Sequence, residues 1–209
     1  MNLQLEAMAL AMPEVAGHPN RLPFRGVLTL VGVASQRAPH GARGHRVMLT
    51  RAATDAALPS LLGMALDYAP SLDSHDVRRK IGIITAANIA PMHNAHPSKT
   101  GLGGAPTLAA TDGARSPVGQ LKVCGYLFAH DFPDIVNEIR TKPGDAGSTL
   151  GMSYEITGVH IPTQDTAIWA VTAFTFTGAA VLRRDRAAYP QTWIALDADI
   201  GRGEAGNYG

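Results

Sequence analysis

The chain has 209 residues, of which 45% are apolar and 17% charged, and this composition excludes a strongly charged disordered chain. The formal net charge of +1 gives no bulk electrostatic attraction to nucleic acid or to an anionic membrane. The one cysteine, Cys124, excludes an internal disulfide framework and a cysteine-based zinc cluster. A length near 200 residues predicts one compact domain with loose ends, here residues 23–189 between an N-terminal lead-in, 1–22, and a C-terminal tail, 190–209.

Runs of β-branched and aromatic residues predict the strands of this domain. In chain order they cover residues 24–33, 46–50, 80–86, 121–129, 151–161 and 167–177. Between the third and fourth lies a stretch, 91–120, that is rich in glycine, proline, serine and threonine, which predicts a flexible insertion.

Apolar residues at helical spacing predict two or three helices. The first covers 54–66, with Thr54 as its cap, and the second covers 131–142, with Asp131 as its N-cap. A third covers 179–189 and stops before Pro190. With six or seven strands, the sequence predicts an α+β fold built on an antiparallel sheet or barrel.

Two polar residues stand where strands begin and are candidates for chemistry. Ser153 lies in LGMSYEI, just after a glycine-bearing turn, and a serine becomes a nucleophile only beside a base. His75 lies in a polar turn before the strand KIGIIT, and the flanking Asp73 and Asp76 could bias its tautomer. Taken singly, each residue is better explained structurally: Ser153 as a strand residue that faces solvent or bonds to backbone, and His75 as a surface histidine in an acidic loop.

The order of these segments resembles the tailed-phage prohead proteases, the capsid maturation serine peptidases that share a fold with the herpesvirus assemblins. A helix containing LPSLLGMALDY is followed by the turn with His75, by KIGIIT and by GYLFAHDFPDIVNEIR. LGMSYEI and the strand VTAFTFTGAAV come next. The resemblance covers residues 25–189 and implies a barrel-like core flanked by helices, with Ser153 as nucleophile and His75 as base.

The third catalytic residue departs from the family pattern, in which a histidine or an acid follows the serine. Alanines occupy the matching positions 167 and 170, and TGAA replaces a segment that contains proline in the family. Asp165 is the acid chosen here, because His160 would lie on the opposite face of an unbroken strand from Ser153. A dyad without a third side chain is the alternative. The resemblance also suggests Arg183 and Arg184 as the paired arginines whose backbone helps form an oxyanion hole, against the reading of a solvated helix face.

The resemblance implies an endopeptidase that processes phage scaffold protein, the precursor of the major capsid protein and its own chain. It would work in the host cytoplasm, inside the assembling procapsid. No cofactor, metal, nucleic acid or membrane is expected, and a homo-oligomer is compatible with the resemblance. One alternative is a catalytically inactive phage assembly protein of the same fold.

A second alternative is a metal-dependent hydrolase that uses clustered histidines. His93 and His96 have a His-x-x-His spacing, and His40 and His45 are also close in sequence, but a zinc site needs more ligands held rigidly. For His130 we expect a capping role at the start of the second helix. For Cys124 we expect a small buried side chain.

Overall fold

The computed structural model describes residues 7–13, 15, 17–92, 118–141 and 149–197. These residues form a sheet of eight strands, a separate pair of strands, two α-helices and one 3-10 turn. The strands are β1 (Ala7–Ala9), β2 (Leu22–Val31), β3 (Arg46–Leu49), β4 (Ala65–Tyr68), β5 (Lys80–Pro91), β6 (Gly119–Leu127), β7 (Leu150–His160), β8 (Ile168–Val171), β9 (Ala173–Arg183) and β10 (Trp193–Leu196). The helices are α1 (Arg51–Ala57) and α2 (Pro133–Thr141), and the 3-10 turn is η1 (Leu58–Leu61).

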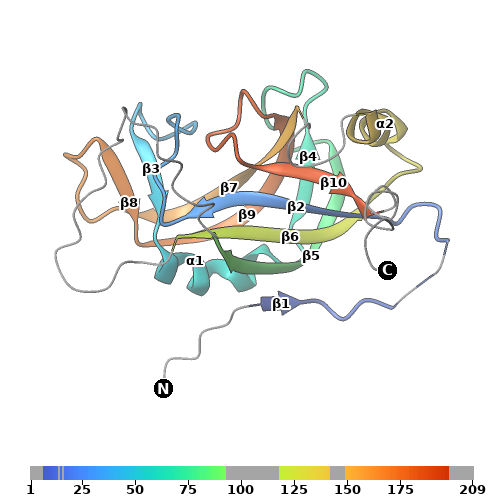
Figure 1. Ribbon diagram of the computed structural model, residues 1–209, viewed down its shortest axis with the longest axis horizontal. Coiled ribbons are helices and arrows are strands. Elements are labelled where there is room, and N and C mark those ends of the chain that lie inside the picture. Colours follow the sequence, from blue (N-terminus) through green and yellow to red (C-terminus); the bar gives the residue numbers. More distant parts are fainter. Residues whose placement is uncertain (1–6, 14, 16, 93–117, 142–148, 198–209) are drawn as a thin grey trace, which may run out of the picture.

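The large sheet has the strand order β10-β2-β6-β5-β4-β9-β7, with β1 paired to β5 beside this path. Its two ends approach each other, since β7 contacts both β2 and β10, so the sheet curls into a half-barrel. β3 and β8 lie together at one end of the molecule and α2 lies at the other (Figure 1). The predicted α+β class is therefore confirmed at the level of a curled sheet with two helices.

Alternation along the strands separates an inner from an outer face. In β6 the buried residues Leu121, Val123 and Leu127 alternate with the exposed Lys122 and Cys124. The inner face packs with the buried sides of α1 and α2 in one hydrophobic core. The outer face of β6 is exposed to solvent and bears the charged Lys122, as expected because successive side chains of a strand point to opposite faces.

Residues 179–189 do not form the predicted helix. Ala179–Leu182 belong to β9, which pairs with β7 on one side and with β4 on the other. The segment is buried on both faces, and a run of small and apolar residues that is buried all round gives no clear period. A bulge between Phe176 and Gly178 also exchanges the inner and outer faces along β9.

The first helix is shorter than predicted and begins earlier. α1 is capped by Thr50, whose hydroxyl accepts a hydrogen bond from the Ala53 amide, whereas Thr54 lies inside the helix and donates to the Thr50 carbonyl. Pro59 stands in η1, and Leu66 belongs to β4 rather than to a helix.

Two predicted details of the sheet are wrong. β4 pairs with β9 in parallel, and so does β3 with β8, so the structure is not purely antiparallel. The large sheet also includes β1 and β10, which come from the segments predicted to be a lead-in and a tail. The predicted insertion lies mostly at residues 93–117, outside the described residues. Among the described helices, none has the length and apolar character to cross a membrane.

Candidate functional site

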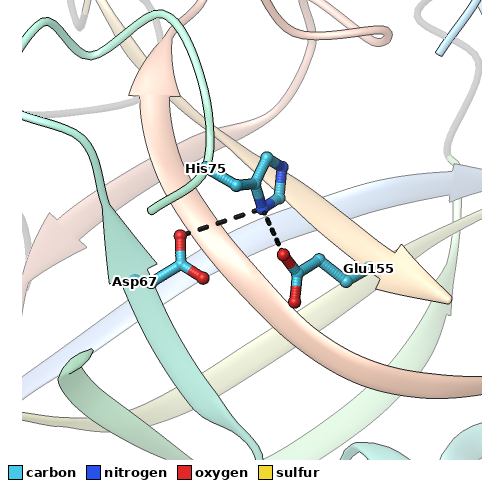
Figure 2. Close-up of side chains that lie close together, drawn as sticks. All are labelled: Asp67, His75 and Glu155. Atoms are coloured by element: carbon cyan, nitrogen blue, oxygen red, sulfur yellow. Dashed lines mark ion pairs between the residues drawn. The ribbon is translucent and has the colours of Figure 1, made fainter. Parts of the chain in front are cut away.

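Three ionisable side chains converge on the outer face of the half-barrel, where β4, β9 and β7 run side by side. Asp67 comes from β4, Glu155 from β7, and His75 from the loop that joins β4 to β5 (Figure 2). One ligand atom from each residue lies within 4.8 Å of the other two. We refer to these three residues as the Asp–His–Glu cluster.

The sheet register explains why the two carboxylates meet although β9 separates their strands. Asp67 pairs with Ala180 of β9, and Glu155 pairs with Gly178 two residues away. Both partners on β9 are small, so the long Glu155 side chain can cross above the strand. A Cβ atom on Gly178 would lie 2.5 Å from Glu155 Oε2, which shows that the glycine makes room for this carboxylate.

The His75 ring turns one nitrogen toward both carboxylates and the other away from them (Figure 2). His75 Nδ1 lies 3.1 Å from Glu155 Oε1 and 3.8 Å from Asp67 Oδ1. His75 Nδ1 and Asp67 Oδ1 are buried, and neither atom has a hydrogen-bond partner. The fully buried Asp67 also accepts a hydrogen bond on Oδ2 from Lys80 Nζ at 3.2 Å. The Asp–His–Glu cluster therefore joins two carboxylates and an imidazole whose Nδ1 is directed at them. The Lys80 ammonium binds the cluster from the side of Asp67.

The acids that flank His75 in sequence bind elsewhere. The Ser71 hydroxyl donates to Asp73 and lowers the pKa of that carboxyl. The backbone amide of Arg78 donates to Asp76 at 3.1 Å and, with the Arg78 side chain, lowers the pKa of Asp76. The expectation that these two residues orient the imidazole is thus corrected, since Asp67 and Glu155 take that position.

Ser153 lies on the same outer face as the cluster. It pairs with Ala180, the residue that also pairs with Asp67, and it stands two positions before Glu155 in a regular part of β7. Alternate residues of a strand share a face and lie about 7 Å apart. Over the described part of the chain, no hydrogen bond joins the half-buried Ser153 to His75. The two residues thus share a surface without a direct proton-sharing contact.

A small cavity of about 20 Å³ borders Ser153 at the edge of β7. That volume holds a water molecule and not an amino-acid side chain. Its lining is mainly apolar and includes Tyr154 and Tyr189, and burial raises the pKa of both phenols. The cavity is therefore not an open substrate cleft in this conformation.

Asp165 is not placed to complete a triad. It is exposed in the loop after β7, beyond the strand end that is remote from Ser153. The seven steps along β7 from Ser153 to His160 would span about 23 Å in a fully extended strand. His160 Nδ1 lies 2.8 Å from the Thr172 hydroxyl instead. The acids closest to His75 are Asp67 and Glu155, so the choice of Asp165 is corrected by position.

The backbone amides of Arg183 and Arg184, which the prediction places in an oxyanion hole, already donate to carbonyl groups of the protein. The Arg183 amide donates to the Leu72 carbonyl and the Arg184 amide to the Thr149 carbonyl, each at 2.7 Å. Arg183 pairs with Asp185 at 3.1 Å, and Arg184 Nε donates to the Thr192 carbonyl at 2.9 Å. Both arginines therefore brace the end of β9 and the turn that follows it.

The remaining candidates have other positions. His45 stacks on Trp169 with ring centroids 4.3 Å apart, and His130 pairs with Asp131 at 3.5 Å at an exposed site before α2. The Asp131 carboxylate accepts from the Asn20 side chain at 2.7 Å. Cys124 is exposed and not buried as predicted. His93 and His96 lie outside the described residues.

Sequence reasoning missed Asp67 and Glu155 although each carries a signal. Glu155 stands two positions after Ser153, and the strand period of two puts both on one face. Asp67 interrupts the apolar run MALDYA, where a buried acid requires a partner. The assignment of that run to a helix concealed this signal, because only a strand beside β9 brings Asp67 under His75.

Comparison of the chain with protein-family models, with curated proteins and with solved structures finds no match.

Proposed function

We propose that this chain is a serine endopeptidase of the prohead-protease type, with Ser153 as nucleophile and His75 as general base. The observation that carries the proposal is the placement of His75 above the outer face on which Ser153 lies, with Nδ1 directed at Asp67 and Glu155. Carboxylates on Nδ1 hold the proton on that nitrogen and leave Nε2 free to accept another.

The mechanism is acyl transfer in two steps. The Ser153 hydroxyl oxygen attacks the scissile carbonyl carbon while His75 Nε2 takes its proton, and the imidazolium then protonates the leaving amine. Water hydrolyses the ester in the reverse sense and returns the proton to Ser153. Asp67 and Glu155 stabilise the imidazolium, and Lys80 limits the repulsion between the two carboxylates.

The proposed substrates are phage scaffold protein, the capsid protein precursor and the chain itself, inside the procapsid. Enclosure with the substrate raises its effective concentration, so a shallow binding surface suffices. His75 lies in a loop, and the mechanism requires this loop to carry the ring to Ser153 when substrate binds, since catalytic hydrogen bonds often form only in the complex.

The proposal is tested with a fluorophosphonate probe, which labels an activated serine without knowledge of the substrate, and with self-cleavage on incubation. Ser153→Ala and His75→Ala are expected to abolish both, with a loss of at least about 10³-fold. Ser71→Ala and His130→Ala are matched controls on exposed polar segments and should react as the unsubstituted protein does. Equal labelling of Ser153→Ala and the original chain would refute the nucleophile.

The alternative is a catalytically inactive phage assembly protein with the same fold. Three observations favour it: Ser153 has no hydrogen bond to His75, the adjoining cavity has room for only one water molecule, and the Arg183 and Arg184 amides donate to backbone carbonyls. Stable assembly with scaffold protein, with neither labelling nor cleavage under any condition, would select this alternative.

A further inference from the structure

We infer that the Asp–His–Glu cluster is a binding site for a divalent cation of the zinc type, and that the bound cation holds the proposed peptidase inactive. The metal site rests on the geometry of three side chains, and the inhibition rests on the proposed function. The mixed set of one imidazole and two carboxylates suits Zn²⁺ chemically.

The spacing of the donor atoms matches a cation of this size. Ligand atoms at about 2.0–2.2 Å from a tetrahedral Zn²⁺ are separated from each other by about 3.3–3.6 Å. His75 Nδ1 lies 3.1 Å from Glu155 Oε1 and 3.8 Å from Asp67 Oδ1, and all three atoms lie within 4.8 Å of one another. Movements below about 1 Å would bring the three donors to a common ion, and a water would complete the tetrahedron.

The unpartnered atoms are the second observation that points to a ligand. Asp67 is fully buried, and its Oδ1 has no hydrogen-bond partner although it faces the ring. His75 Nδ1 is also buried and makes no hydrogen bond, and the atom that faces it at 3.1 Å is Glu155 Oε1. Buried polar atoms are normally satisfied, so the unpartnered Asp67 Oδ1 that faces His75 Nδ1 and Glu155 points to a ligand shared by the three side chains.

The surrounding charges agree with a dication. Lys80 binds Asp67 Oδ2 and so leaves Oδ1 as the oxygen of that carboxylate that can coordinate a metal ion. The two acids and Lys80 together carry one net negative charge, and the site lies in a partly buried environment where that charge is weakly screened. Gly178 leaves space for Glu155 to adjust toward the ion.

Occupancy of this site would remove the catalytic base. Coordination uses the Nδ1 lone pair, so the one proton of the neutral ring resides on Nε2. Nε2 then has no lone pair to accept the Ser153 proton, and attack on the peptide carbonyl stops. A chain made with excess zinc would remain inactive until the ion is withdrawn.

The experiment measures Zn²⁺ binding directly by calorimetry and Co²⁺ binding by its visible absorption. The full chain carries His93→Ala and His96→Ala to remove the other histidine pair. One site per chain is expected, and Glu155→Gln and Asp67→Asn should each weaken it at least tenfold. Asp73→Asn and His130→Ala are matched controls and should bind as the parent does. Circular dichroism verifies that each variant is folded.

Gly178→Ala is an independent variant that displaces Glu155 without changing a ligand, and it should weaken binding as well.

The outcomes separate the two proposals. Unchanged affinity in Glu155→Gln, Asp67→Asn and Gly178→Ala would overturn the metal site whatever the activity. Peptidase activity that Zn²⁺ leaves unchanged or increases would overturn the inhibition. Metal binding that depends on these residues, in a chain that never labels with fluorophosphonate, would keep the metal site and refute the proposed function.

Discussion

The two faces of the half-barrel differ in the size of their side chains. The comparison is between the inner face at β2, β6 and β5 and the outer face at β4, β9 and β7. The inner face is filled by large apolar side chains such as Phe24 and Leu28, which are completely buried. The outer face at β9 carries only Gly178 and Ala180 between the acids of its neighbours. Large side chains stabilise the first region, and small residues leave space for the Asp–His–Glu cluster in the second.

The largest effect on stability is expected from Phe24→Ala. Phe24 is fully buried on β2, and loss of its ring leaves a cavity in the core. We expect a loss of about 3–5 kcal/mol in the free energy of unfolding. Denaturant titration with an unchanged m-value measures it. A loss below about 1 kcal/mol would show that the inner face is not the close-packed region described here.

Two glycine substitutions compare the faces directly. A Cβ on Gly125, inside the barrel, would lie 2.0 Å from the Ile83 carbonyl oxygen, so backbone must move. A Cβ on Gly178 would clash with the end of the Glu155 side chain, which can turn away, and would lie in ordinary contact, 3.7 Å, with the Ala65 carbonyl oxygen. We expect Gly125→Ala to destabilise by about 3 kcal/mol and Gly178→Ala by less than about 1 kcal/mol. Thermal or urea unfolding of the two variants side by side gives the comparison, and equal losses would contradict it.

Much of the inner face was predictable from the sequence and the outer face was not. The apolar run LKVCGYLFA predicts a strand over 121–129, and the structure has β6 there, at Gly119–Leu127, with one side buried and the other exposed to solvent. AAVL at the start of the predicted helix 179–189 lies in β9, where it is buried on both sides, so its pattern shows no strand period. Cys124 was expected to be buried because its neighbours are apolar, although the alternation puts it outside.

The candidate site was predicted in part, as single residues. Local sequence and resemblance single out His75 and Ser153, and the structure places both on the same outer face. The proximity of Asp67 to Glu155 depends on the parallel pairing of β4 with β9. This contact joins segments far apart in sequence, so local sequence patterns do not predict it. The same pairing moves the search for an acid from Asp165 to the other end of β7.

Asp67→Asn is expected to have a smaller effect on stability than either large inner-face change. The substitution keeps the shape and removes the buried charge that binds Lys80. Because Lys80 is 37% exposed, its ammonium can turn to water, and we expect a loss of about 1–2 kcal/mol.

The double variant Asp67→Asn with Lys80→Met serves as the control for this pair. It should recover part of the loss, because it removes the ammonium left without its partner. Chemical denaturation of the single and double variants measures the coupling. Strictly additive losses would show that the Asp67–Lys80 pair does not contribute to stability.

The smallest expected effect concerns Cys124, on the outer face of β6 and across from Arg25 of β2. Partial burial raises the pKa of the thiol, Asp197 raises it further and Arg25 lowers it. The folded protein therefore keeps the thiol proton to higher pH than the unfolded chain does. Its contribution to stability is complete below the unfolded pKa of about 8.5 and declines as the pH rises above that value.

Alkylation by iodoacetamide at pH 8 measures this effect on the thiol, because only the thiolate reacts. We expect slower reaction in the folded protein than in denaturant. Asp197→Asn should accelerate the folded reaction and Arg25→Gln should slow it, each by less than about tenfold. Acceleration by Arg25→Gln would mean that steric access, and not charge, controls the thiol.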